Sequence, residues 1–190
     1  MRKLILAAAL TGLSFSAFAA ETYTIDPDHT YPYFTINHLG FSTMHGRFNA
    51  TKGKIVLDKT GATSAVDIVI DAASVDTGMK KRDDHLRSPD FLNATEFPGI
   101  TYKSSKVTFS GAKKATVDGT LTIAGVSKPV KLDVQSINCG VHPMDPKKEK
   151  FVCGFDATAK IKRSDFGVKY GLPAIGDDMV ISLEVEAVRN

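Results

Sequence analysis

A chain of 190 residues with 43% hydrophobic content is long enough to bury one substantial core and too short for two full domains. Its formal net charge is +3, and removal of an N-terminal leader containing Arg2 and Lys3 would lower it to +1. A chain so close to neutral lacks the basic surface that nucleic-acid binding requires, so we expect one domain with no nucleic-acid partner.

The first nineteen residues have the pattern of a secretory signal peptide. Arg2 and Lys3 supply a positive start, residues 4–13 form a short apolar stretch, and residues 17–19 read Ala-Phe-Ala, a small-residue cleavage site. We therefore assign residues 1–19 to the leader and residues 20–190 to the mature domain. No later segment approaches the roughly 20 apolar residues that a spanning helix needs. We expect a soluble protein that is periplasmic or secreted.

Alternating apolar residues predict strands in the N-terminal half at 23–25, 29–38, 46–48, 54–58 and 65–70. The longest of them places Phe34, Ile36 and His38 on one face. The runs at 54–58 and 65–70 flank a Lys-Thr-Gly turn and predict a hairpin. Residues 39–44 are apolar but lack alternation, so we expect an irregular connection there.

Residues 79–98 form the longest stretch without strand alternation between the leader and a polar loop in the 140s. Charges concentrate between Lys80 and Arg87, whereas Leu86, Phe91 and Leu92 give the stretch an apolar side. Because strands flank it on both sides, we expect a short helical flap lying on a sheet or across a barrel mouth. We place the functional site at this flap and in the cavity beneath it.

Strands resume after the flap at 100–109, 116–123, 129–137, 151–161 and 179–188. In the first of these the apolar parity changes between Tyr102 and Val107, which predicts a bulge or strong bend. The next two form a second hairpin across Gly125. Residues 164–167 predict a single helical turn, which we expect Arg163 and Asp165 to hold in place.

Two cysteines, Cys139 and Cys153, flank a polar loop that contains Pro143 and Pro146. In a chain bound for an oxidising compartment this pattern favours a disulfide. Closing a loop of that size contributes about 3 kcal/mol in the chain-entropy model. A metal site has little support here, because the spacing is far from CxxC and His142 is the lone histidine nearby.

About eight strands with short links predict an all-β, antiparallel protein. Each strand has one apolar face, and eight such strands bury those faces either in a sandwich or in a closed barrel. Strands near ten residues long favour the barrel, which can be solid or can hold one small ligand. The inward positions include Gly46, Gly119, Ala157 and Ala159, so we expect unfilled interior volume; the alternative is that these small residues relieve crowding at barrel bends.

Several short motifs follow one another along the mature chain. They are His29 with residues 34–40 (FTINHLG), 46–48 (GRF), 74–77 (SVDT), 82–88 (RDDHLRS) with 90–92 (DFL), 119–123 (GTLTI) with 128–130 (KPV), and 163–167 (RSDFG). In this order they resemble the YceI family of polyisoprenoid-binding, lipocalin-like secreted proteins. The resemblance implies an extended eight-stranded barrel with a helix over one end and a long apolar tunnel for an isoprenoid lipid or quinone. It also implies a homodimer, whereas the cysteine pair is outside the family pattern.

The resemblance directs attention to side chains that would form the tunnel and its entrance. Tunnel-lining candidates are Phe34, Ile36, His38, Phe41, Met44, Phe48, Ile68, Leu86, Phe91, Leu92, Tyr102 and Ile181. Head-group candidates near the flap are His45, Arg82, His85 and Arg87. Alternatively, the apolar candidates are ordinary core, His38 is a hydrogen-bonded core histidine, and the two arginines form salt bridges with Asp83 or Asp90.

Two other functions remain open at this point. An enzyme acting on such a lipid needs a nucleophile or a metal, but the sequence has no HExxH, GxSxG or P-loop, and the spacing of His29, His38 and His45 does not favour a metal site. A solid barrel would instead be a protein-interaction module that uses outward tyrosines such as Tyr31 and Tyr33. We expect a non-enzymatic carrier or store of an isoprenoid lipid, without cofactor or metal, that contacts a membrane transiently.

Overall fold

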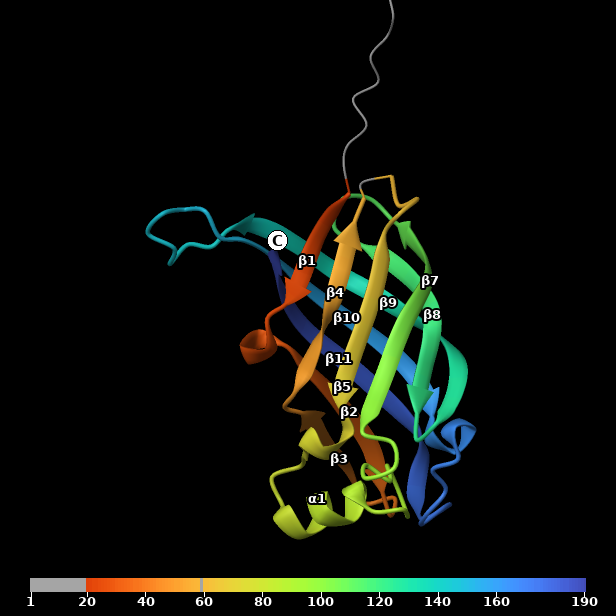
Figure 1. Ribbon diagram of the computed structural model, residues 1–190. Helices are drawn as coiled ribbons and strands as arrows, with labels where there is room; N and C mark the ends of the chain where they lie inside the picture. Colours follow the sequence, from red (N-terminus) through yellow and green to blue (C-terminus); the bar gives the residue numbers. More distant parts are fainter. Residues whose placement is uncertain (1–19, 59) are drawn as a thin grey trace, which may run out of the picture.

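The computed structural model describes residues 20–58 and 60–190, and the expected leader at 1–19 lies outside this range. Eleven β-segments form one antiparallel sheet, which closes because β1 pairs with β11 as well as with β4 (Figure 1). The segments are β1 (Glu21–Ile25), β2 (Tyr31–His38), β3 (Ser42–Phe48), β4 (Thr51–Leu57), β5 (Ala65–Asp71), β6 (Val75–Asp76), β7 (Gly99–Phe109), β8 (Ala115–Ile123), β9 (Val126–Val141), β10 (Phe151–Lys162) and β11 (Ile175–Arg189). The helix α1 spans Lys80–Arg87, and no helix of the described chain is long and apolar enough to cross a bilayer.

The eleven segments make eight barrel strands, because three of those strands are interrupted. Both β1 and β2 run antiparallel to β11, with the 3₁₀ turn η1 (Pro27–His29) between them. The segments β3 and β4 form the second interrupted strand: β3 pairs with β2, and β4 pairs with β1. The segments β5 and β6 form the third: β5 pairs with β4, and β6 pairs with β3. The predicted all-β, eight-stranded antiparallel barrel with one short helix over an end is therefore confirmed.

Local chemistry explains two differences between the predicted and the observed strands. Asp26 accepts a hydrogen bond from the backbone N–H of Asp28 at 3.1 Å and, with Pro27 after it, starts η1, so the strand expected at 29–38 begins at Tyr31. The connection expected at 39–44 is shorter, because β3 begins at Ser42, opposite His38 on β2. The predicted bulge in β7 is confirmed by a register shift between Ser104 and Lys106.

The two ends of the barrel close differently. At one end β1 completes a hydrogen-bonded ring, whereas at the other the sheet order stops at β6, and the ladder between β5 and β7 ends at the pair Asp71 and Gly99. The chain between β6 and β7 crosses this gap as α1 followed by a series of turns (Figure 1). The gap therefore positions the flap over one end of the barrel, which we call the mouth.

The end opposite α1 is filled by a packed core. Tyr23, Cys153 and Ala187 are at most 1% exposed and belong to one hydrophobic cluster with Ile25. The predicted disulfide is confirmed: Cys139 and Cys153 lie directly opposite each other on β9 and β10. Beyond it the β9–β10 hairpin projects from the barrel (Figure 1).

One buried arginine fixes the loop between η3 (Arg163–Phe166) and β11. Arg163 is 4% exposed, and its guanidinium donates to the carbonyl oxygens of Gly176 at 2.8 Å, Tyr170 at 2.8 Å and Ile175 at 3.0 Å. Burial lowers the pKa of this guanidinium from its usual value.

The helical turn predicted at 164–167 is confirmed as η3, but its anchor differs from the expected one. Asp177 accepts hydrogen bonds from the Ser164 backbone at 2.9 Å and hydroxyl at 2.7 Å, and these bonds lower its pKa. Asp165 is exposed, so the prediction that it holds the turn was wrong. Spacing alone could not separate it from Asp177, which reaches the turn only because β11 lies beside it.

Candidate ligand-binding cavity

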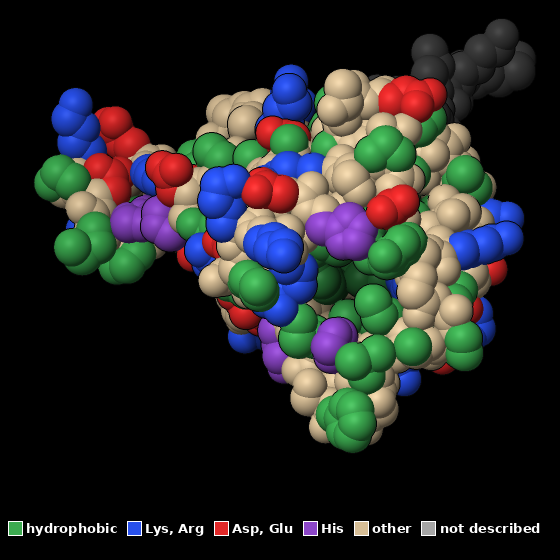
Figure 2. All heavy atoms as spheres, turned by 90° about the horizontal axis from the view of Figure 1, so that it is seen from below, with side chains coloured by type: hydrophobic (Ala, Val, Ile, Leu, Met, Phe, Trp, Pro, Cys, Tyr) green, Lys and Arg blue, Asp and Glu red, His purple; other side chains and the backbone are tan. Residues whose placement is uncertain are grey.

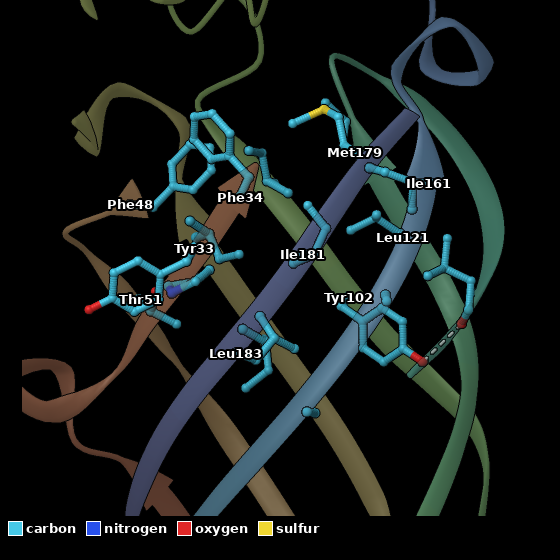
Figure 3. Close-up of a pocket in the computed structure, with 18 of the residues that line it drawn as sticks. Tyr33, Phe34, Phe48, Thr51, Tyr102, Leu121, Ile161, Met179, Ile181 and Leu183 are labelled. Carbon is cyan, nitrogen blue, oxygen red and sulfur yellow. Dashed lines mark hydrogen bonds between the residues drawn. The ribbon is translucent and has the colours of Figure 1, made fainter. Parts of the chain in front are cut away.

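The barrel interior contains a cavity of about 690 Å³ that opens at the mouth. This volume lies within the roughly 300–1,000 Å³ typical of small-molecule sites. Side chains from β2, β3 and β11 project into it, among them Phe34, Phe48, Ile181 and Leu183 (Figure 3). Seen from below, the molecule is hollowed and its interior is apolar (Figure 2). The solid barrel considered from the sequence is therefore wrong.

Eleven predicted tunnel residues line this cavity. They are Phe34, Ile36, His38, Met44, Phe48, Ile68, Leu86, Phe91, Leu92, Tyr102 and Ile181. Several, such as Ile36 and Ile181, face inward and yet are only half-buried, because they border open space rather than other side chains. Leu86, Phe91 and Leu92 come from the flap, so the flap forms part of the cavity wall.

Phe41 does not line the cavity and is 89% exposed, so its prediction as a tunnel residue was wrong. The physical reason is a tight turn between β2 and β3. Leu39 and Gly40 adopt positive φ angles of 57° and 76°, and Phe41 donates its N–H to the carbonyl of His38 at 3.0 Å. The prediction relied on the apolar character of Phe41, which does not indicate the direction that this turn gives the side chain.

The small inward residues have two different roles. A Cβ atom at Gly46 would collide with the Phe34 ring, and one at Gly119 would collide with the Tyr102 ring. These glycines therefore make room for aromatic rings rather than leaving free volume, which corrects that part of the prediction. Ala157 does line the cavity, as does Ala159 beside it.

Two polar side chains of the deep wall, Tyr102 and Thr51, are labelled in Figure 3. The Tyr102 hydroxyl lies 2.9 Å from the carbonyl oxygen of Val117 and 3.1 Å from that of Val130, and burial raises its pKa, so it stays a neutral donor. The Thr51 hydroxyl is buried and has no hydrogen-bond partner among the described residues. Neither forms the nucleophile–base pair that covalent catalysis requires.

Polar groups gather at the mouth, where His38, His45, Arg82 and His85 all border the cavity. Arg82 does not pair with Asp83; its Nε donates to the Thr77 hydroxyl at 2.7 Å, and a terminal nitrogen donates to the Thr77 carbonyl at 2.8 Å. Its other terminal nitrogen lies 3.8 Å from the Met44 sulfur, a weak acceptor. That nitrogen is therefore the donor of Arg82 most available to a ligand.

Arg87 lies away from the cavity, so the structure does not support its prediction as a head-group residue. Its Nε donates to the Ala73 carbonyl at 2.7 Å, and its terminal nitrogens donate to the Val75 carbonyl and to Asp84, each at 3.0 Å. The last turn of α1 directs this side chain toward the chain before β6. Arg87 therefore anchors the helix to the barrel.

A YceI-like domain model matches residues 23–187, which is nearly all of the described chain. The chain belongs to the YceI family. It is 37% identical to Protein YceI of Shigella flexneri over 194 residues, and the match covers 100% of this chain and 99% of the relative. The family assignment made from the sequence motifs is confirmed.

Solved structures place this YceI chain among similar barrels. Burkholderia cenocepacia BcnA superimposes with a TM-score of 0.75 at 25% identity, covering 86% of this chain and 99% of BcnA. A polyisoprenoid binding domain from Saccharophagus degradans, implicated in plant cell wall breakdown, superimposes with a TM-score of 0.63 at 17% identity, covering 88% and 98%. The second likeness shows a shared fold.

The loop before β11 also contributes to the YceI mouth, which was not predicted from the sequence. The Tyr170 ring packs edge-on against the His85 ring, with their centroids 5.0 Å apart, and its centroid lies 5.3 Å from that of Phe91. The His85 and Phe91 rings also pack edge-on, with their centroids 4.9 Å apart. A ring nitrogen of His85 also lies 2.8 Å from Asp90. Tyr170 is in a turn without alternation, so only its aromatic character could have marked it.

Possible metal ligands gather outside the cavity. His29, His38 and His45 do not converge; within the described chain, the group close enough for a metal is Asp26, His29 and Glu186, whose ligand atoms lie within 4.8 Å of one another. Asp26 is already 3.2 Å from His29 and 3.8 Å from the Lys150 ammonium. Asp26 is therefore already engaged by two neighbouring side chains.

Proposed function

We propose that this YceI protein binds an isoprenoid lipid, either a polyprenyl chain or an isoprenoid quinone, and transports or stores it in the periplasm. The observation that carries the proposal is the apolar cavity of about 690 Å³, in a fold shared with the polyisoprenoid binding domain of Saccharophagus degradans. Binding is non-covalent, with no catalytic step and no resident cofactor. The leader pattern and the disulfide between Cys139 and Cys153 support the location.

The hydrophobic effect supplies enough affinity for this ligand class. Transfer of an apolar group from water contributes about 0.8 kcal/mol per CH₂, so each five-carbon isoprene unit contributes about 4 kcal/mol before the costs of ordering. The half-buried wall residues, among them Ile36, Ile68 and Ile181, are the surfaces that such a tail would cover. An apolar tail therefore needs no charge pairing along the cavity.

The polar head group would remain at the mouth, near His38, His45, Arg82 and His85. The free terminal nitrogen of Arg82 suits a carbonyl or phosphate oxygen, because it can donate without breaking the bonds to Thr77. On the deep wall Tyr102 is committed to backbone carbonyls, and the Thr51 hydroxyl is a neutral group without the charge of a guanidinium.

Native mass spectrometry of the protein purified from its own source tests the proposal. We expect a retained apolar species with an isoprenoid mass, and Phe91→Arg should lower its occupancy at least tenfold, since this side chain lines the cavity from the flap. Val180→Arg is the matched control, because Val180 is 40% exposed on the outside of β11.

Circular dichroism should show the same barrel in both variants. An empty wild-type protein, or equal lipid occupancy in Phe91→Arg, would contradict the proposal. Turnover of the retained species would favour the enzyme instead. The homodimer implied by the family resemblance stays a prediction, and the same spectra measure it.

A further inference from the structure

We propose that the rim of the mouth is a docking surface for an anionic lipid bilayer. The mouth rim comprises the turn at 39–41, the segment 77–91 and the loop 167–175. The inference rests on the proposed function, because an isoprenoid ligand resides in membranes and must pass between the bilayer and the cavity. It adds the place and the manner of that transfer.

Exposed apolar side chains concentrate on the mouth rim. Seven large hydrophobic residues of the described chain are well exposed, and four of them lie here: Leu39 at 47%, Phe41 at 89%, Met79 at 49% and Tyr170 at 49%. A patch of this kind around a cavity entrance marks an interaction site. Figure 2 shows apolar side chains surrounding the hollow and projecting beyond it.

The three segments of the mouth rim are joined into one surface. Leu39 in the first donates its N–H to the carbonyl of Ala174 in the third at 2.9 Å. Tyr170 in the third packs on the rings of His85 and Phe91 in the second. The exposed residues are therefore held around the same opening.

The turn at 39–41 presents its apolar residues in a fixed geometry. Gly40 donates its N–H to the Asn37 side chain at 2.9 Å, and Phe41 donates to the carbonyl of His38. Leu39 adopts a φ of 57°, which is unfavourable for a bulky residue, and this geometry keeps it and Phe41 in solvent. Because the backbone of this turn is already held in place, its ordering adds little to the entropic cost of inserting these side chains into a bilayer interface.

The charges around the mouth rim complement an anionic surface. Lys81 and Lys169 are exposed on it and form no ion pair with any described residue, whereas Lys80 is held by Asp84 at 2.6 Å. On the adjacent outer wall, Lys128 and Lys160 border a shallow hollow and are also unpaired within the described chain. Free lysines next to exposed apolar residues are the pattern of proteins that bind at the bilayer interface.

Docking in this orientation explains how the ligand moves. With the mouth rim on the bilayer, the cavity entrance faces the hydrocarbon region, so an apolar tail passes from lipid to cavity without crossing water. The flap residues that line the cavity lie at the same entrance. The surface and the cavity therefore form one route.

Co-sedimentation of the mature protein with vesicles of phosphatidylethanolamine and phosphatidylglycerol tests the surface. We expect binding that Phe41→Asp weakens at least tenfold. Lys81→Glu and Lys169→Glu should each weaken it by about fivefold and should act less at high salt. Met144→Asp is the matched control, because Met144 is 83% exposed on the β9–β10 hairpin at the other end of the barrel, and it should bind as the wild type does.

Absence of vesicle binding, or equal binding by the Phe41 and Met144 variants, would overturn the proposal. The proposal would also be overturned if the wild-type protein were a dimer that does not bind vesicles and that Phe41→Asp dissociates. The mouth rim would then be the interface with a second copy of the chain. Lipid content separates this proposal from the previous one. If the protein binds vesicles but retains no lipid, the proposed lipid carriage is refuted and the docking surface stands. If it retains lipid but does not bind vesicles, only the docking surface is refuted.

Discussion

The two ends of the barrel are built from the same alternating strands but differ in how they are filled. At the end opposite α1, which we call the closed end, Tyr23, Cys153 and Ala187 are fully buried. At the mouth the inward-facing Ile36 and Ile181 remain half-buried beside the cavity. The ring of strand pairs is complete at the first end and open between β6 and β7 at the second. The tightest packing is therefore at the end opposite α1, whereas the opening of the cavity is at the mouth.

Truncating one isoleucine at each end gives the largest expected contrast. Ile25→Ala removes a side chain that is 4% exposed in the closed-end cluster and should lower the free energy of unfolding by about 3–4 kcal/mol. Ile25 also borders the cavity, so the contrast rests on burial: Ile36→Ala, in the same interrupted strand, removes a side chain that is only half-buried and should lower the free energy of unfolding by about 1 kcal/mol. Urea unfolding of lipid-free protein measures both, and equal losses would show that the mouth is packed as tightly as the closed end.

The disulfide provides the next test, with a somewhat smaller effect. Replacing both Cys139 and Cys153 by alanine should lower the unfolding free energy by about 3 kcal/mol, because the unfolded chain is no longer constrained. Alanine avoids burying a new hydroxyl at position 153, which is 0% exposed. Lipid occupancy measured by native mass spectrometry should not change. A loss of lipid in this variant would mean that the two ends are coupled.

The smallest expected effect is the acid sensitivity of the closed end. Hydrogen bonds from the backbone and hydroxyl of Thr60, together with those from Thr63, lower the pKa of Asp58 to about 2. An unfolded aspartate titrates near about pH 4, so this stabilisation is complete above about pH 4 and disappears as the pH falls toward about 2.

Asp58→Asn should therefore destabilise the protein at neutral pH. It should also remove the loss of stability that Asp58 causes between about pH 4 and about pH 2, as measured by urea unfolding midpoints across that pH range. Asp165→Asn is the control, because Asp165 is exposed and, among the described residues, its carboxylate accepts no hydrogen bonds like those that Asp58 accepts. Parallel acid profiles for wild type and Asp58→Asn would contradict the assignment.

The spacing of residue types along the sequence predicted the features that depend on short stretches of chain. The strands, the flap, the disulfide and the cavity-facing parity of Phe34, Ile36 and Ile181 all follow from residue types at fixed spacing. The flap was predicted because the stretch lacks strand alternation, concentrates charge between Lys80 and Arg87, and still has an apolar side that a linker would not need. The hollow itself was expected partly for a wrong reason, since Gly46 accommodates a ring.

The errors arose where tertiary geometry decides. Phe41 is outside the cavity because a turn with positive φ reverses the chain, and Arg87 bonds to carbonyls that are distant from it in sequence. Tyr170 and Asp177 reach the mouth and the turn only through the loop that Arg163 fixes. Neither spacing nor composition records contacts of this kind.

The opening between β6 and β7 has a consequence for how the wall of the cavity can vary. The segment from Thr77 to Pro98 bridges that opening, and side-chain bonds from Arg82 and Arg87 secure its helix. A longer, shorter or differently charged segment inserted between Asp76 and Gly99 would leave every strand pair of the ring intact. The part of the cavity wall that the flap forms can therefore vary at one site of the chain while the strand pairs of the barrel stay unchanged.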